Sequence, residues 1–172
     1  LHTNSSVETV TRLLDMGMDP FNFADSLLGV LAQRLVRRLC SKCVQSQPAT
    51  PQQTEELMAD YMHAFGEIEA KAKPDDVLAG WMKRFGKDGK LMHHFASGCT
   101  NCDDTGLRGR AGLHELLVVS RDIRRLIQTG ARPDELLRTA QSEGLRTLRQ
   151  DGIDKVWAGL TTIEEVRASS NS

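Results

Sequence analysis

The tetrapeptides Cys40-Ser41-Lys42-Cys43 and Cys99-Thr100-Asn101-Cys102 are the two stretches around which this chain is organised. They contain every cysteine of the 172 residues, and 55 residues separate the two pairs. Two residues between thiols allow both sulfurs of a pair to face one point, so two pairs can supply a closed tetrahedral zinc site. A disulfide within either pair would close too short a loop to constrain the unfolded chain much. We therefore predict one structural Zn²⁺ bound by four thiolates: Cys40, Cys43, Cys99 and Cys102.

The residues around both pairs suit such a site, because four thiolates on one zinc leave a net charge of about −2 that nearby cations offset. Five basic residues flank the pairs: Arg37, Arg38, Lys42, Arg108 and Arg110. His93 and His94 precede the second pair and could each replace a thiolate. Since four thiols already complete the coordination shell, we expect both histidines to lie outside it.

Composition and charge place the chain among ordinary globular proteins. A length of 172 residues suits one domain or two small ones, and 40% hydrophobic with 26% charged residues is unexceptional. The net charge of −1 gives no electrostatic basis for binding nucleic acid. No apolar run approaches the roughly 20 residues of a membrane span, and thiols in a zinc pattern favour a reducing cytoplasm. The chain begins Leu-His-Thr-Asn without a methionine, so we expect it to be part of a longer protein.

Hydrophobic periodicity predicts a mostly α-helical chain with a few strands, an α+β fold. Ser5 and Glu8 form a capping-box pattern that begins a helix, which Gly17 ends. A second, long helix is predicted over residues 20–39, because leucines recur there at helical spacing and arginines occupy its last turn. This helix would lead directly into Cys40.

Further elements follow from the same signals. Two helices are predicted after Pro51 and Pro74, and short strands over residues 91–95 and 110–119. Amphipathic helices fill the rest of the chain and are expected to form a compact bundle. One helix is expected to begin at Ser120, one at Pro133 and one at either Thr161 or Thr162, and a further helix contains Leu148.

Several catalytic patterns are missing from the sequence. It has no G-x-x-x-x-G-K-[ST] phosphate loop, no Rossmann glycine fingerprint and no metal site with an open position. The five histidines form no metalloprotease or triad pattern: His2, His63, His93, His94 and His114. The residues of this stretch therefore give no basis for catalysis by it alone.

Six stretches nevertheless carry a family resemblance: LHTN (1–4), TRLLDMG (11–17), SLLGVLAQRLVRRLCSKC (26–43), GCTNCDDTGLRGR (98–110), GLHELL (112–117) and TTIEEV (161–166). In order and local spacing they resemble the C-terminal part of the ATPases that power type II secretion and type IV pilus assembly, the general secretion pathway protein E family. The tetracysteine followed by TGLRGRAGLHELL is the most specific of these features.

The resemblance implies three parts: the end of a RecA-like α/β core at residues 1–39, a zinc subdomain at 40–102, and a C-terminal helical subdomain at 103–172. It implies that the four cysteines are the zinc ligands of the family. It also places His2 at the end of a His box that senses nucleotide near the phosphates. The phosphate loop and the Mg²⁺ carboxylates would precede Leu1, so we expect no ATP turnover from these residues alone.

The resemblance also implies a setting and partners. Proteins of this family are cytoplasmic homohexamers, peripheral to the inner membrane, that bind ATP and Mg²⁺ and move a membrane platform protein. The predicted helix over residues 20–39 would then act as a rigid lever between His2 and the zinc subdomain. Secretion and pilus assembly remain equal alternatives, and residues 44–95 match no family pattern.

Two readings from other classes stay open on the residues alone. One is a free-standing zinc adaptor that binds another protein, and the other is a thiol redox protein that uses its C-x-x-C pairs. The start without methionine and the LHTN stretch favour the ATPase part. A zinc content near one per chain, retained against mild oxidant, would exclude the redox reading.

Overall fold

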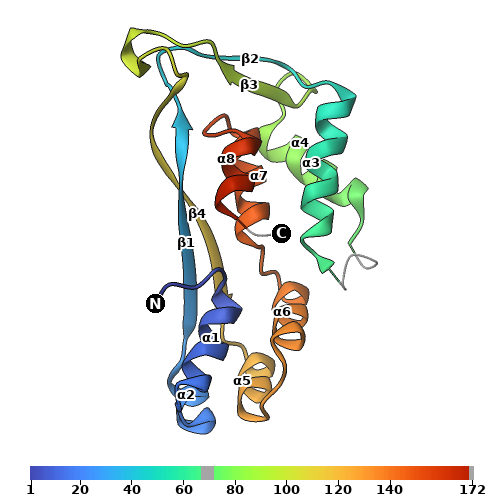
Figure 1. Cartoon of the computed structure of the whole chain (residues 1–172). Coiled ribbons are helices and arrows are strands. Elements are labelled where there is room, and N and C mark those ends of the chain that lie inside the picture. Colours follow the sequence, from blue (N-terminus) through green and yellow to red (C-terminus); the bar gives the residue numbers. More distant parts are fainter. Residues whose placement is uncertain (67–71, 171–172) are drawn as a thin grey trace. The chain divides into compact units, whose positions relative to one another are not determined.

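The computed structural model describes residues 1–66 and 72–170 (Figure 1). The fold is α+β, as predicted, with helices as the main elements and two small two-stranded sheets. The chain divides into two compact units, each built from two segments. We call Leu1–Gln33 with His114–Leu148 the first unit, and Arg34–Leu113 with Arg149–Ser172 the second unit.

The helices and strands have the following bounds in chain order: α1 Ser6–Asp15, α2 Pro20–Ser26, β1 Gly29–Leu39, β2 Val44–Pro48, α3 Pro51–His63, α4 Pro74–Phe85, β3 Met92–Ala96, a 3₁₀ turn Thr100–Cys102, β4 Leu107–Val118, α5 Arg121–Gln128, α6 Pro133–Ser142, α7 Leu148–Trp157 and α8 Ile163–Ser169. The expected helices after Pro51 and Pro74 and both expected strands are confirmed. None of the described helices is long and apolar enough to cross a membrane.

The long helix predicted over residues 20–39 is wrong. Helix α2 ends at Ser26, and β1 occupies Gly29–Leu39 and pairs with β4. The leucines that suggested a helix recur every four residues, and four is a multiple of the two-residue period of a strand as well as close to a helical turn. A rigid helical lever into Cys40 is therefore excluded, because a strand makes that connection.

The first unit packs its helices and the adjoining strand residues around one core. Buried apolar residues from α1, α2, β4, α5, α6 and the residues that follow β4 and α6 form it: Val7, Val10, Phe23, Ala24, Leu117, Val119, Ile123, Ile127, Leu136, Ala140 and Leu145. Ser5 caps α1 by accepting a hydrogen bond from the Glu8 amide at 3.1 Å. The Glu8 carboxylate accepts from the Asn4 amide at 2.7 Å, so only half of the predicted capping box is formed.

Glu115 is a buried carboxylate of the first unit, with a relative exposure of 3%. It accepts hydrogen bonds from the Ser6 amide (2.9 Å), the Ser6 hydroxyl (2.7 Å) and the Leu148 amide (3.2 Å). Ser6 and Leu148 are the first residues of α1 and α7. The carboxylate thus satisfies the free N–H groups at two helix starts, where the helix dipole also favours negative charge.

The second unit has a separate core that is rich in aromatic rings. Tyr61 and Trp81 lie edge to face with ring centroids 5.3 Å apart, and Trp81 and Trp157 lie 5.5 Å apart. The Trp81 indole donates to the Asp154 carboxylate at 3.2 Å. These rings belong to α3, α4 and α7, so the core joins helices from both segments of the unit.

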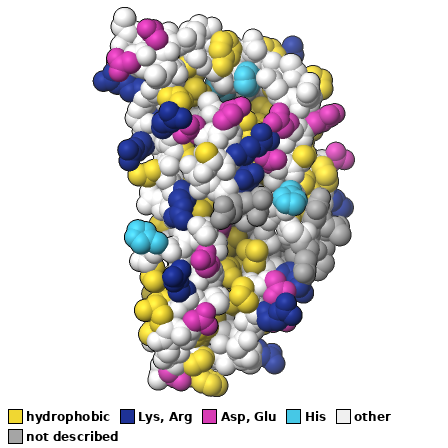
Figure 2. Space-filling model, viewed as in Figure 1, with side chains coloured by type: hydrophobic (Ala, Val, Ile, Leu, Met, Phe, Trp, Pro, Cys, Tyr) yellow, Lys and Arg dark blue, Asp and Glu magenta, His cyan; other side chains and the backbone are white. Residues whose placement is uncertain are grey.

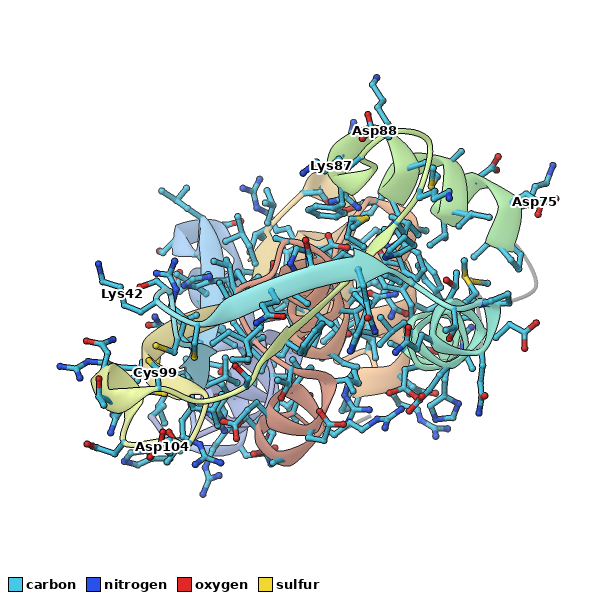
Figure 3. The ribbon with its side chains drawn as sticks, turned by 90° about the horizontal axis from the view of Figure 1, so that it is seen from above. Lys42, Asp75, Lys87, Asp88, Cys99 and Asp104 are labelled. Carbon is cyan, nitrogen blue, oxygen red and sulfur yellow. The ribbon has the colours of Figure 1, made fainter. Side chains whose placement is uncertain are left out.

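The sheet of the second unit is the antiparallel β2–β3 ribbon, in which Ser46 pairs with His94. Figure 3 shows Lys42, Cys99 and Asp104 at one end of this ribbon and Asp75, Lys87 and Asp88 at the other. The ribbon therefore leads from the helices α3 and α4 to the cysteines. Helices α5 and α6 belong to the first unit and α8 to the second, so the single bundle expected from the sequence stays a prediction.

Candidate metal centre

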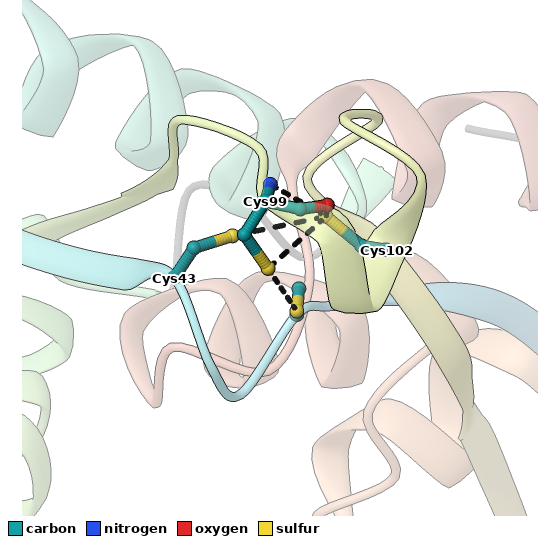
Figure 4. Close-up of side chains that lie close together, drawn as sticks. Cys43, Cys99 and Cys102 are labelled. Atoms are coloured by element: carbon teal, nitrogen blue, oxygen red, sulfur yellow. Dashed lines mark hydrogen bonds between the residues drawn. The ribbon is translucent and has the colours of Figure 1, made fainter.

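The structure brings the four cysteine sulfurs together, all within 4.8 Å of one another (Figure 4). Three sulfur–sulfur distances are 3.8 Å for Cys40–Cys99, 3.9 Å for Cys43–Cys102 and 3.8 Å for Cys99–Cys102. Four sulfurs at about 2.3 Å from a tetrahedral zinc lie about 3.8 Å from one another. No disulfide joins them. The donor set therefore fits a closed tetrathiolate zinc site.

The first pair occupies a tight turn between β1 and β2. Cys40 follows the last residue of β1, and its carbonyl accepts hydrogen bonds from the amides of Cys43 (3.3 Å) and Val44 (2.9 Å). These bonds fold the backbone back on itself, so both sulfurs of the pair face the same point.

The second pair lies on a 3₁₀ turn that needs unusual backbone conformations. Gly98 has φ +94°, and a β-carbon there would lie 2.7 Å from the Asp104 carbonyl oxygen, closer than real contacts. Asp103 and Asp104 also adopt the left-handed region, with φ of 51° and 59°. Short polar residues tolerate this region best after glycine. The run of turn-forming residues therefore builds the second half of the site.

Hydrogen-bond donors point at the sulfurs from both sides. The side-chain amide of Asn101 donates to the Cys40 sulfur at 3.4 Å. The backbone amides of Cys99 and Gly106 both donate to the Cys102 sulfur at 3.2 Å. Such donors stabilise thiolates and commonly surround bound zinc.

These contacts shift the thiol pKa values in different directions. The Asn101 amide, followed by the Lys42 backbone amide, lowers the pKa of Cys40 to about 6. Burial raises the pKa of Cys102, but the Cys99 and Gly106 amides outweigh it, and the net pKa is lowered. Burial raises the pKa of Cys43 to about 12. A bound metal ion deprotonates a coordinating thiol outright, which would remove this last obstacle.

The basic residues predicted around the site have separate roles. The guanidinium of Arg108 donates to the Asn101 carbonyl and so supports the second turn. Arg37 instead forms an ion pair with Glu165 at 2.5 Å, and its backbone amide donates to the same carboxylate at 3.0 Å. Arg37 is therefore paired with a carboxylate of α8.

The predicted histidines lie outside the cysteine group. His94 donates to the Trp157 backbone carbonyl, and a β-carbon at Gly159 would clash with its ring at 2.7 Å. The His93 ring stacks near Phe95, with centroids 6.0 Å apart. His2 is exposed at the start of the first unit, and its predicted role in sensing nucleotide stays a prediction.

Sequence reasoning overlooked two groups that the structure makes prominent. Asn101 lies between the cysteines of the second pair, and its side-chain amide donates to the Cys40 sulfur of the first pair. Glu115 lies within the LHELL stretch between two buried leucines, Leu113 and Leu117. Side chains of a strand alternate between its two faces, so Glu115 shares the buried face with Leu113 and Leu117. The sequence could therefore have indicated a buried carboxylate at this position.

Comparison with known proteins gives matches along almost the whole chain. A family model described as "Type II/IV secretion system protein" matches residues 1–168. The chain is 43% identical over 168 residues to "Type II secretion system protein E" of Pectobacterium carotovorum, which covers 96% of the chain and 28% of that relative. It is 36% identical over 168 residues to "Type IV pilus assembly ATPase PilB" of Thermus thermophilus, covering 98% of the chain and 16% of the relative. It is 37% identical over 166 residues to "Type II secretion system ATPase E" of Vibrio cholerae, covering 96% of the chain and 28% of the relative.

Proposed function

Because this chain belongs to the type II/IV secretion system protein family, we propose that it is the C-terminal part of an ATPase that drives type II secretion or type IV pilus assembly. The observation that carries the proposal is a match over 96–98% of the chain to relatives named as such proteins. The chain spans only 16–28% of the length of these relatives. The remaining machinery of the motor is therefore assigned to residues outside this sequence.

The first part of the proposal concerns nucleotide. Residues 1–39 complete a RecA-like core, and ATP and Mg²⁺ bind to a phosphate loop and carboxylates outside the chain, with His2 near the phosphates. Several large apolar side chains of the first unit are exposed, and they are compatible with this placement, because a contiguous apolar surface is typical of an interface. They are Leu1, Met16, Met18, Phe21, Leu28, Leu31, Leu116 and Val118, and hydrophobic side chains are visible on the face drawn in Figure 2.

The second part concerns the metal. Cys40, Cys43, Cys99 and Cys102 hold one Zn²⁺, which supplies a structural cross-link and no catalysis, because four thiolates leave no position for water or substrate. The sulfur spacing and the amide donors support this. The cross-link joins the turn between β1 and β2 to the segment between β3 and β4, two segments that are distant in sequence.

The third part concerns assembly. Six copies of the complete protein form a cytoplasmic ring at the inner membrane, and ATP hydrolysis moves a platform protein of the secretion or pilus machine. The extensive match to both secretion and pilus relatives supports a shared motor role. It also favours a motor part over a free-standing zinc adaptor.

A chimaera tests the proposal directly. The matched 28% of the Vibrio cholerae ATPase is replaced by this chain, and ATP hydrolysis, ring formation and secretion are measured in a strain that lacks the native protein. We expect a folded ring that hydrolyses ATP and restores secretion. A chimaera that folds and forms rings but hydrolyses no ATP would contradict the proposal.

A further inference from the structure

A cavity of about 410 Å³ opens in the second unit beside strand β3. It adjoins the cysteine site, because its lining includes Gly106, whose amide donates to the Cys102 sulfur. All five residues of β3 line it and no residue of β2 does, so the cavity follows this strand along its whole length. The other walls come from α3, α7, α8 and the backbone just after the second cysteine pair, and Figure 1 shows β3 above α7 and α8. Its volume lies at the low end for ligand sites, which suits one or two side chains rather than a nucleotide cofactor.

The inner wall of the cavity is apolar. Leu39, Leu57 and Trp157 line it and are each at most 6% exposed, and the half-buried Val156 and Ile163 complete it. The Trp157 indole N–H has no hydrogen-bond partner in the part of the chain that the structure describes. A wall of this kind favours an aromatic or branched aliphatic group.

The rim of the cavity is acidic. Glu56 and Glu164 are exposed lining residues, and no lysine or arginine of residues 1–66 and 72–170 lines the cavity. Glu56 is already paired with Arg167 at 2.9 Å, which leaves Glu164 to meet a ligand. Burial lowers the pKa of His94, which disfavours a positive charge on its ring beside the rim. The charge therefore suits a cation beside an apolar group.

One edge of β3 has no strand partner among the described residues. The sheet has two strands, β2 and β3, and no strand in residues 1–66 or 72–170 pairs with the other edge of β3. An unpaired edge can accept an extended peptide as an added strand. Side chains two residues apart on such a peptide share one face, so an apolar residue can enter the cavity while residues on either side of it reach the rim.

We propose that this cavity binds an extended segment of a partner polypeptide, with an apolar side chain in the cavity and Lys or Arg two residues away facing Glu164. The segment adds to the free edge of β3. The inference uses only the geometry of the second unit and does not depend on the proposed ATPase function.

Titration with three matched peptides tests the proposal, using the 172-residue chain with equimolar Zn²⁺. The three peptides are acetylated at the N-terminus and amidated at the C-terminus. Their sequences are Lys-Thr-Phe-Thr-Lys, Glu-Thr-Phe-Thr-Glu and Lys-Thr-Ser-Thr-Lys. The chain has two tryptophans, so ¹⁵N NMR shows two indole N–H signals, and that of Trp157 reports binding in the cavity. We expect saturable shifts of Trp157, smaller shifts of the already bonded Trp81, and at least tenfold weaker binding of the other two probes.

Three variants locate the site. Glu164→Gln should weaken the first peptide about two- to fivefold, the range of one exposed ion pair, whereas Glu55→Gln on the exposed surface of α3 should leave it unchanged. Ile163→Trp should fill the cavity and abolish saturable binding. A copy of the first peptide that is N-methylated along its backbone should bind at least tenfold more weakly, because it cannot pair with β3.

The same experiment can overturn the proposal. No saturable Trp157 shift, equal affinity for all three peptides, or indifference to Glu164→Gln would each refute it. Binding of tryptamine without binding of the peptide would identify a small-molecule pocket instead. A Trp157 shift that depends on the concentration of the chain alone would identify a second copy as the occupant.

Discussion

Replacing Glu115 tests the view that one buried carboxylate holds two helix starts in the first unit. Glu115→Ala leaves the Ser6 and Leu148 amides without their acceptor, and the Ser6 hydroxyl loses its 2.7 Å bond. Each orphaned donor costs about 1–3 kcal/mol, and the lost charge beside two helix dipoles adds roughly 0.3–1 kcal/mol for each helix. Part of this is offset, because the carboxylate no longer has to be desolvated. We expect a loss of about 3–5 kcal/mol in the free energy of unfolding.

Glu115→Gln separates charge from shape. Its carbonyl oxygen can still accept both Ser6 donors, but its amide nitrogen then faces the Leu148 amide. We expect a smaller loss of about 1.5–3 kcal/mol, the cost of one hydrogen bond to a charged group. Glu55→Ala, on an exposed face of α3, serves as the control and should change stability by less than about 0.5 kcal/mol.

Urea unfolding followed by far-UV circular dichroism measures the stability, because both tryptophans lie in the second unit and fluorescence would report that unit. Hydrogen exchange at the Ser6 and Leu148 amides measures the local effect. A cost below about 1 kcal/mol for Glu115→Ala, with unchanged exchange at both amides, would refute this reasoning.

Three further outcomes are expected. Cys99→Ser should lower the bound zinc well below one ion per chain by elemental analysis and unfold residues 40–102 first, since zinc in such sites contributes on the order of 10 kcal/mol to folding; a reduced, folded wild-type chain without metal would contradict the site. The Arg37 side chain lowers the pKa of Glu165, and the Arg37 backbone amide adds to this effect against the opposing effect of burial. The ion pair therefore stabilises the fold above the ordinary glutamate pKa, and this contribution is lost as pH falls through the lowered pKa. Glu165→Gln should flatten that part of the acid unfolding curve, and an unchanged curve would argue against this role of the ion pair. The 172-residue chain should show no ATP turnover and no micromolar binding of an ATP analogue with Mg²⁺ in calorimetry; tight binding would show that the phosphate site lies within it.

The metal centre could be predicted because its signal is local. Two residues between thiols set the geometry of each pair, and the four sulfurs do meet. The helix starts at Pro51, Pro74 and Pro133 could be predicted for the same reason, since proline fits the first turn of a helix and little else.

The rest required tertiary information. Strand β1 was missed because leucines four residues apart fit a strand as well as a helix, and only pairing with β4 decides between them. The cavity beside β3 could not be predicted, because Leu57, His94, Trp157 and Glu164 come from four elements spread over more than a hundred residues. Its charge and shape exist only after those elements pack.

The distance between the paired cysteines also governs how the protein is made. Cys40 lies near Cys99 and Cys43 near Cys102, each across 59 positions of sequence. At roughly 5–20 residues per second, a ribosome takes about 3–12 s to reach the second pair after completing the first. During that interval the nascent chain carries half a ligand set that cannot close around an ion. The first pair must therefore stay reduced while it waits, and thiol alkylation of ribosome-stalled chains should find Cys40 and Cys43 reactive until residue 102 has emerged.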